Sequence, residues 1–154
     1  MRSVLLDTNL LVLLVVGRCN TGYISNHKRT RIFSVEDYQL LIEIIGGYDT
    51  VWVTSHCFAE ASNLLKQTTG KKAGDLLFCL SELVARCRES HIEKSLLFDK
   101  TCFTRLGVAD TGFVIKSKRV SCSFTVDLDL YLEVSRSGGK VINSSEATPQ
   151  TNEP

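Results

Sequence analysis

The chain of 154 residues is predicted to fold as one α/β domain, with a central, mainly parallel sheet in a three-layer α/β/α arrangement. Three observations predict this fold class. Short runs of apolar and β-branched residues alternate along the chain with longer segments of helical periodicity. Acidic or helix-capping residues directly follow three of these runs, which is typical of strands that end at one edge of a parallel sheet. The apolar fraction of 44% is enough for a single domain of this length to bury a core.

The first strand and helix are predicted by the apolar pattern near the start of the chain. Val4–Leu6 form a short apolar run, which is typical of a buried strand, and the apolar residues that continue to Val16 predict a buried helix. This stretch is too short to span a membrane, and Asp7 and Asn9 interrupt it. We therefore expect a core strand and helix here, and no contact with a membrane.

A helix, a strand and another helix are predicted next. Ser34 and Asp37 have the spacing of a capping box, which starts a helix that a pair of glycines ends. Val51–Val53 predict the second strand because two β-branched valines flank an aromatic residue in an apolar run. The helix that follows is expected to begin at Ser55 or His56.

The second half of the chain completes the predicted fold. Apolar residues three and four positions apart predict a helix over Lys72–Glu89, and a glycine-containing break precedes a helix that carries Asp110. β-Branched and aromatic residues over Val120–Val126 predict the last strand, and an amphipathic helix follows it. The domain is therefore expected to cover residues 1–142, and residues 143–154 form a tail without a hydrophobic pattern.

Four acidic residues occupy positions where the pattern predicts apolar surroundings or the carboxyl end of a strand. Asp7 and Asp127 directly follow the first and last predicted strands. Glu60 lies one helical turn from a leucine of an apolar stripe, and Asp110 shares a helix face with Phe113. Because the carboxyl ends of parallel strands meet at one edge of a sheet, where ligands bind, we expect a buried acidic pocket at that edge.

Such a pocket requires compensation of its negative charge. Two carboxylates about 4 Å apart repel each other by about 1 kcal/mol in water and by about 4 kcal/mol at an effective dielectric constant of about 20. Carboxylate oxygens suit hard cations such as Mg²⁺ or Mn²⁺, and Mg²⁺ takes further oxygen ligands from water and from substrate phosphates. The pattern therefore predicts a Mg²⁺ or Mn²⁺ site that hydrolyses phosphodiester bonds.

Each acid taken alone has a simpler structural interpretation. Asp7 together with Asn9 is compatible with a strand-to-helix turn, and Asp110 or Asp127 with the N-cap of its own helix. Glu60 is compatible with an ordinary solvated helix residue. The metal-site interpretation rests on the four positions together, because four independent coincidences are rarer than one shared cause.

Four segments of the sequence resemble the PIN domains, a family of metal-dependent ribonucleases that is common among the toxins of bacterial toxin-antitoxin pairs. These segments are LLDTNLL near the N-terminus, FAEASNLL after the second strand, VADTGFV in mid-chain and FTVDLDLYL before the last helix. Their order, and the strand or helix on which each lies, agree with the family from residue 1 to about 142. The resemblance implies a PIN-like fold and the activity of a Mg²⁺- or Mn²⁺-dependent endoribonuclease, which is a hydrolase.

The resemblance also assigns roles to individual residues of the acidic pocket. It implies four catalytic, metal-binding carboxylates, which are Asp7, Glu60, Asp110 and Asp127. It implies that Asn9 and Thr125 are polar residues that support them, and Asp129 adds a nearby acid to this supporting group. RNA is the substrate that the resemblance implies. An antitoxin protein is a partner of the toxins in this family, and many such domains form homodimers.

The surface outside the acidic pocket is predicted to be basic. Of the 17 acidic residues, 12 remain when the four carboxylates and Asp129 are set aside, against 18 basic residues. The densest basic cluster is NHKRTR, residues 26 to 31, in which Lys28, Arg29 and Arg31 are predicted to contact an RNA phosphate backbone. The alternatives are a solvated loop and a binding surface for an acidic protein.

The cysteines and histidines do not predict a zinc site. The six cysteines have no C-x-x-C spacing, and several lie in apolar runs such as LLFCL, so buried, reduced thiols are expected instead of disulfides. His27 and His91 are expected at the surface or in loops, and His56 lacks a second matched histidine. This composition is typical of a cytoplasmic protein.

Two other classes of function share part of this pattern. Phosphatases with an aspartate nucleophile also place an acid after their first strand, in an hhhhD-x-D pattern, but here Asn9 occupies the place of their second acid. The main alternative is a catalytically inactive PIN-like module that binds RNA or a partner protein. The complete set of four acids favours the enzyme.

Overall fold

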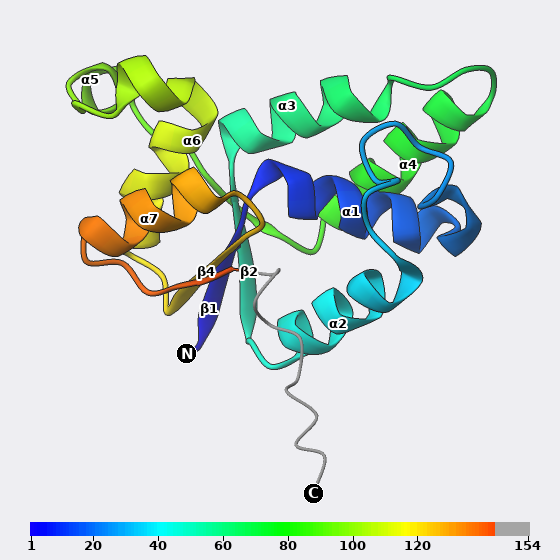
Figure 1. Ribbon diagram of the computed structural model, residues 1–154, viewed down its shortest axis with the longest axis horizontal. Helices are drawn as coiled ribbons and strands as arrows, with labels where there is room; N and C mark the ends of the chain where they lie inside the picture. Colours follow the sequence, from blue (N-terminus) through cyan, green and yellow to red (C-terminus); the bar gives the residue numbers. More distant parts are fainter. Residues whose placement is uncertain (144–154) are drawn as a thin grey trace, which may run out of the picture.

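The computed structural model describes residues 1–143 and confirms the predicted fold class, because helices flank a five-stranded, all-parallel sheet (Figure 1). In chain order the elements are β1 (Ser3–Leu6), α1 (Thr8–Cys19), the 3-10 helix η1 (Thr21–Tyr23), α2 (Val35–Gly46), β2 (Thr50–Thr54), α3 (Ser55–Leu65), α4 (Lys72–Val84), β3 (Arg88–Ser90), α5 (Lys94–Phe98), α6 (Phe103–Ser117), β4 (Cys122–Thr125), α7 (Leu128–Arg136) and β5 (Val141–Asn143). Asn143 is thus the last residue of a strand, and the rest of the predicted tail lies outside the described residues.

The order of the strands in the sheet identifies the edge at which a ligand is expected. This order is β3-β2-β1-β4-β5, so the chain builds the sheet outward from β1 in one direction and from β4 in the other. Ligands of open parallel sheets bind outside the carboxyl ends of the strands at such a reversal point. Asp7 directly follows β1, and Asp127 lies two residues after β4. Two of the predicted acids therefore flank the reversal point.

Different helices cover the two faces of the sheet. Val4 and Leu6 of β1 point to one face and join a large core with α1, α2, α3 and α4. Leu5 points to the opposite face, where it joins Phe113 of α6 and Leu130 of α7. All five side chains are buried. Figure 1 shows these two layers on either side of the central strands, as the three-layer prediction requires.

Helix α1 lies in the middle of the larger core. Nine of its 12 residues are buried, which explains why apolar residues occur on all sides of it. At Gly17 the helix is in close contact with α2, because a Cβ atom there would lie 2.3 Å from Tyr38 Cδ2. Among the described residues, none of the helices combines the length and the apolar character that crossing a membrane requires.

The structure differs from the sequence-based prediction at the β3 edge of the sheet. The helix predicted over Lys72–Glu89 ends at Val84, and Arg88–Ser90 form β3. This short edge strand exposes Arg88 and Glu89, so it lacks the apolar alternation by which a strand is detected in sequence. The prediction also omits β5 and α5, which have three and five residues. Elements of this length are below what periodicity can detect.

Candidate metal-binding active site

Asp7 is the most deeply buried of the four predicted acids, with 3% of its surface exposed. It is the N-cap of α1, where its Oδ1 accepts a hydrogen bond from Leu10 N at 2.8 Å. Its Oδ2 accepts hydrogen bonds from Thr125 Oγ1 at 2.5 Å and from Val126 N at 3.2 Å. Burial raises the pKa of Asp7 to about 6, because removal of water disfavours the charged form more than these hydrogen bonds favour it.

Thr125 connects Asp7 to Asp127. While its hydroxyl group donates to Asp7, the same oxygen accepts a hydrogen bond from Asp127 N at 3.0 Å. Asp127 is in turn the N-cap of α7, since its Oδ1 accepts from Leu130 N at 3.1 Å. This network fixes the positions of Asp7 and Asp127, which follow neighbouring strands, relative to each other. Thr125 contacts both acids, as a supporting residue would.

Glu60 and Asp110 approach the pocket from helices instead of strand ends. Glu60 belongs to α3, which begins directly after β2, and Asp110 belongs to α6. Gly107 has a φ of 82° and interrupts the helical geometry of α6, a conformation that glycine adopts readily. Asp110 lies three residues beyond this break and is not an N-cap, so the capping interpretation is wrong for this residue.

The charges of three of the acids act on the fourth, Asp110, so the four acids lie within electrostatic range of that residue. The pKa of Asp110 is raised to about 7, first by burial and then by the negative charges of Glu60, Asp127 and Asp7. Partial burial also raises the pKa of Glu60, although that residue is exposed overall. The ion pairs within residues 1–143 involve none of these four acids. Their mutual repulsion is therefore not offset by an ion pair with a basic side chain of this part of the chain.

The donor atoms of the acidic pocket fit a hard divalent cation. No hydrogen bond contributes to the pKa shifts of Glu60 or Asp110, so their carboxylate oxygens keep their lone pairs for a cation. Asp7 Oδ1 accepts one hydrogen bond and has a second lone pair. Within the described residues, no three histidine, cysteine or acidic side chains already form a compact metal-binding group. Binding of a cation would therefore have to draw the carboxylates closer together.

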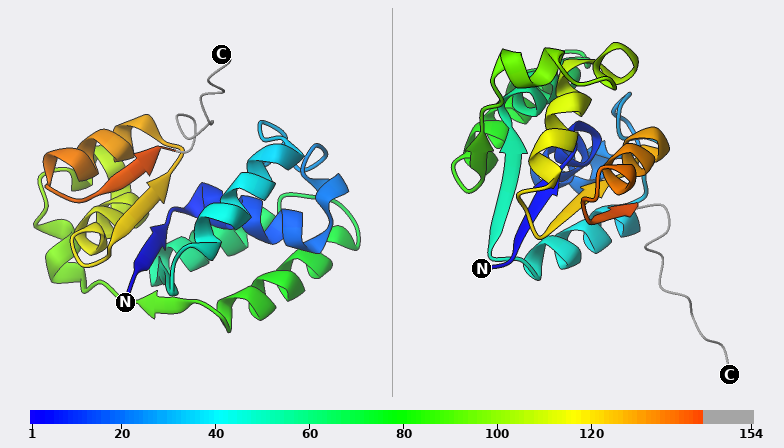
Figure 2. Two further views of the ribbon diagram at one scale, coloured as in Figure 1. Left: turned by 90° about the horizontal axis from the view of Figure 1, so that it is seen from below. Right: turned by 90° about the vertical axis from the view of Figure 1, so that its left-hand side faces the viewer.

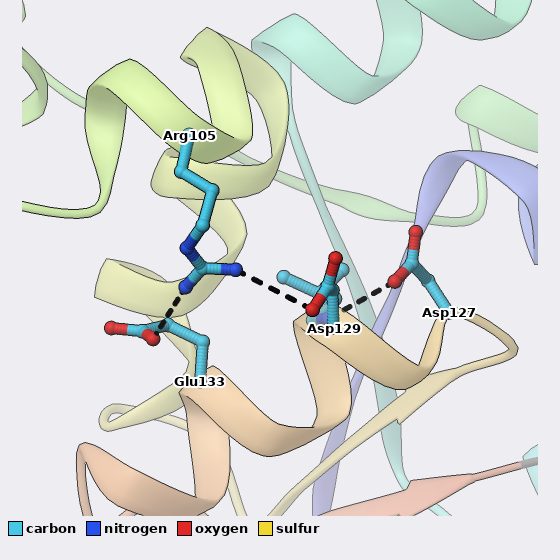
Figure 3. A network of polar contacts seen from close by, with 5 residues as sticks. Arg105, Asp127, Asp129 and Glu133 are labelled. Carbon is cyan, nitrogen blue, oxygen red and sulfur yellow. Dashed lines mark hydrogen bonds and ion pairs between the residues drawn. The ribbon is translucent and has the colours of Figure 1, made fainter.

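Two of the predicted supporting residues lie outside the hydrogen-bond network of the pocket. Asn9 is exposed in the first turn of α1. Asp129 has 74% of its side chain exposed and forms an ion pair with Arg105 at 3.6 Å (Figure 3). Arg105 also contacts Glu133 Oε2 at 2.8 Å. The Asp129 carboxylate is thus directed to a surface arginine, whereas Asp127, at the start of the same helix, accepts a hydrogen bond from the backbone of α7.

The basic cluster of residues 26 to 31 does not lie at the acidic pocket. It follows α1, whose 12 residues span about 18 Å, and Asp7 lies at the opposite end of that helix. Both Figure 1 and Figure 2 show the segment between α1 and α2 at the opposite end of the molecule from α7. Lys28 and Arg31 are exposed, and Arg29 Nε donates to Gln67 Oε1 at 2.6 Å. An RNA strand that contacts both sites would have to span at least the length of α1, across the surface of the helices that cover it.

His27 lies in the segment between η1 and α2, so its expected position in a loop is confirmed, but it is buried and not at the surface. Only 4% of its surface is exposed. Its Nδ1 accepts a hydrogen bond from Arg29 N at 3.1 Å, and its Nε2 lies 3.2 Å from Leu65 O. Because Nδ1 accepts, Nε2 carries the proton and donates to that carbonyl. His27 therefore anchors the basic segment to the C-terminal end of α3.

One further acid lies at the carboxyl end of the sheet and is missed by the sequence analysis. Glu89 belongs to β3, and its Oε1 accepts a hydrogen bond from Ser55 Oγ at 2.6 Å. Its charge is not among the causes that raise the pKa of Asp7 or Asp110. The sequence analysis missed Glu89 because it predicted a helix, and not a strand, for this part of the chain. Glu89 orients the start of α3 and lies outside the acidic pocket.

Comparison of the sequence with protein-family models and with curated proteins finds no match. The observations that bear on function are therefore those of the site itself. Asp7 and Asp127 follow the two strands at the reversal point of the parallel sheet, and the charges of Glu60, Asp127 and Asp7 act on Asp110. Their carboxylates form a candidate site for a divalent cation.

Proposed function

We propose that this chain is a metal-dependent endoribonuclease whose acidic pocket binds Mg²⁺ or Mn²⁺. The observation that supports this most strongly is Asp110, whose pKa is raised to about 7, first by burial and then by the charges of Glu60, Asp127 and Asp7. Asp7 and Asp127 also cap helices, but Glu60 and Asp110 cap none. A cation would offset the repulsion, whereas a purely structural role explains the exposed Glu60 as a solvated helix residue but leaves the partly buried Asp110 unexplained.

Some residues of the pocket would bind a cation, and another residue would keep one of these ligands in its orientation. A divalent cation bound there supplies positive charge that polarises the scissile phosphate and lowers the pKa of a bound water. Glu60 and Asp110 would hold it with oxygens that accept no hydrogen bond, and Asp7 with the free lone pair of Oδ1. Thr125 keeps Asp7 in a fixed orientation through its hydroxyl group. One of the carboxylates accepts the proton of the attacking water.

RNA is proposed as the substrate on the basis of the PIN-domain resemblance and the basic excess outside the pocket. The same resemblance is the basis for proposing a toxin role, an antitoxin partner and a homodimer. The six cysteines are free, which fits a reducing compartment such as the cytoplasm. These proposals are separable from the metal site, because a nuclease of RNA maturation or decay would need the same carboxylates.

The proposed activity is tested by incubating transfer, ribosomal and messenger RNAs with wild type and with Asp110→Asn, in Mg²⁺, Mn²⁺ or EDTA. Discrete cuts by wild type alone that disappear in EDTA would support the proposal. Equal cutting by both proteins, or cutting that persists in EDTA, would contradict it. RNA that is bound but never cut would favour the alternative, a PIN-like binding module without catalytic activity.

Thr125→Val is expected to lower both the stability and the activity of the protein. The substitution removes the donor to Asp7 and the acceptor for Asp127 N, and an unsatisfied buried group costs about 1–3 kcal/mol. It also raises the pKa of Asp7 further, because the Thr125 hydrogen bond favours the ionised form. Loss of such a supporting contact typically lowers activity by about 10–100-fold. Urea unfolding and RNA cleavage measured at pH 6 and pH 8 check this, with the larger loss of activity expected at pH 6.

Thr125→Ser is the matched control for this substitution, because it keeps the hydroxyl group. It is expected to retain the pH dependence of wild type. If Thr125→Val lost stability but kept an unchanged pH profile, Thr125 would be a structural residue without influence on the Asp7 carboxylate.

Replacement of Lys28 and Arg31 by Ala is expected to weaken RNA binding without impairing the pocket. Both side chains are exposed, and each phosphate contact that is lost should reduce the slope of log K against log salt by about 1. Binding of a long RNA measured between low and high salt checks this. Hydrolysis of a short oligonucleotide that cannot reach the basic cluster is expected to stay at the wild-type rate. An unchanged salt slope would mean that the cluster serves another partner.

A further inference from the structure

A groove of about 480 Å³ is bordered by α3, α5 and α6, the first and last of which carry Glu60 and Asp110. Its walls are mainly apolar and include Leu97, Phe98 and Val108, and His56 and His91 also line it. The ring centroids of the two histidines are 6.4 Å apart, and their planes are inclined by 35°. The volume lies within the range of small-ligand pockets, about 300–1,000 Å³.

The groove and the acidic pocket are built on the same two helices. In α3, His56 lies one turn before Glu60, and residues four positions apart share a helix face. In α6, Val108 directly follows the break at Gly107, and Asp110 follows two positions later. One turn of helix advances about 5.4 Å. On α3, a ligand that extends from Glu60 to the groove at His56 therefore has to span about one helical turn.

We propose that this groove binds one unpaired nucleobase of the RNA strand whose phosphate lies at the acidic pocket. This inference rests on the proposed function and adds to it a binding site for one base of the substrate. Unpaired bases stack on aromatic and histidine rings, which Phe98, His56 and His91 provide here. A base inside a duplex is already stacked and paired, so it would first have to be extruded.

The chemistry of the groove favours a base over a phosphate group. One carboxylate, from Glu93, and one ammonium group, from Lys94, line it, so the charges balance. The apolar walls gain free energy by covering a flat base, whereas a phosphate group would lose its hydration there without compensation. Phe98 is 56% exposed and therefore has surface for a base to cover. Its ring packs edge to face on Phe103, with ring centroids 4.6 Å apart, which limits its movement.

The proposal is tested by measuring the binding of fluorescent single-stranded RNA to Asp110→Asn in Mg²⁺, so that cleavage does not interfere. Each nucleotide in turn is replaced by an abasic nucleotide. We expect one position, next to the bond that wild type cuts, at which removal of the base weakens binding about 5- to 150-fold. This is the range for one base stacked on an aromatic side chain. A duplex of the same sequence is expected to bind as weakly as the abasic strand.

Two variants of the groove and one control connect this effect to the structure. The abasic penalty is the factor by which removal of the base weakens RNA binding. Phe98→Ala or His91→Ala, added to Asp110→Asn, is expected to reduce this penalty to about 2-fold or less, because the coupling between base and ring is lost. Phe78→Ala is the control, since Phe78 is 64% exposed and belongs to α4, which lies at the opposite end of the molecule from α5 (Figure 1). It is expected to keep the full penalty. His91 is exposed, so its substitution tests the groove even if Phe98→Ala disturbs α5.

The outcomes separate the groove from the proposed function. If wild type cuts RNA but no position shows an abasic penalty, the base-binding proposal is wrong and the nuclease proposal stands. A penalty that persists in both groove variants would also overturn it and leave the groove as a surface for another molecule, such as a protein. A penalty that depends on Phe98 and His91, in a protein that cuts no RNA, would support base binding and contradict hydrolysis.

Discussion

Asp110→Asn is expected to reduce metal-dependent RNA hydrolysis by at least about 10³-fold and to stabilise the metal-free protein. The loss of activity follows because a metal contributes several kcal/mol to catalysis, and each 1.36 kcal/mol is about tenfold in rate. The gain in stability follows because burial and three neighbouring acids raise the pKa of Asp110 from 3.8 to about 7. That shift corresponds to roughly 4 kcal/mol, and we expect about 1–2 kcal/mol because solvent screens this partly exposed group. Urea unfolding in EDTA at pH 8 measures the gain.

Asp129→Asn is the matched control, because it makes the same chemical change at a neighbouring exposed acid. Asp129 is paired with Arg105 at the surface, so activity is expected within about 3-fold of wild type and stability within about 0.5 kcal/mol. Asp7→Asn is less informative, because its amide group would face two donors, Thr125 Oγ1 and Val126 N, and would destabilise the fold. Destabilisation by Asp110→Asn, or retained activity, would contradict a shared acidic site.

The metal-free protein is expected to lose stability as the pH rises from 5 to 8. The pKa values of Asp7 and Asp110 in the folded protein are about 6 and about 7, above the ordinary value of 3.8. In this range the folded protein binds more protons than the unfolded chain, so the free energy of unfolding falls with pH. The contribution of these groups is complete below pH 3.8 and is lost as the pH passes through 6 and then 7. For Asp7 the rise of the pKa from 3.8 to about 6 corresponds to roughly 3 kcal/mol in the free energy of unfolding.

Divalent cations are expected to reverse this loss. A ligand that binds only the folded protein at about 100 times its Kd adds about 2.7 kcal/mol to the free energy of unfolding. Mn²⁺ should therefore stabilise wild type at pH 8 and have little effect at pH 5, where Asp7 and Asp110 retain protons. Urea unfolding at both pH values, with EDTA or Mn²⁺, checks both expectations. A free energy of unfolding that is constant or rises with pH in EDTA would show that Asp7 and Asp110 do not have raised pKa values in the folded protein.

Much of the fold could be predicted because β1, β2 and β4 are apolar runs that helix-capping residues follow. The capping box of Ser34 and Asp37 is likewise present at the start of α2. Asp7 and Asp127 show why single residues were ambiguous in sequence, since each is both an N-cap and part of the acidic pocket. The two roles coexist in Asp7 because Oδ1 keeps a second lone pair beside the capping hydrogen bond, and in Asp127 because the cap uses only Oδ1.

The features that were not predicted depend on contacts between distant segments. His27 is buried because Leu65 O, 38 residues away, accepts its hydrogen bond, and no periodicity marks such a contact. The separation of the basic cluster from the pocket follows from the length of α1, which composition does not encode. The groove requires α5, which has only five residues. β3 escapes detection because an exposed edge strand is polar.

The central claim is that the four carboxylates act together as a site for a divalent cation, and calorimetric titration of Mn²⁺ into the metal-free protein at pH 7.5 tests it most directly. For wild type we predict saturable binding of one or two ions per chain with release of protons, because Asp7 and Asp110 must be ionised to bind metal. For Asp110→Asn we predict binding that is at least about tenfold weaker, with less proton release. Absence of binding to wild type, or equal binding to both proteins, would contradict the claim.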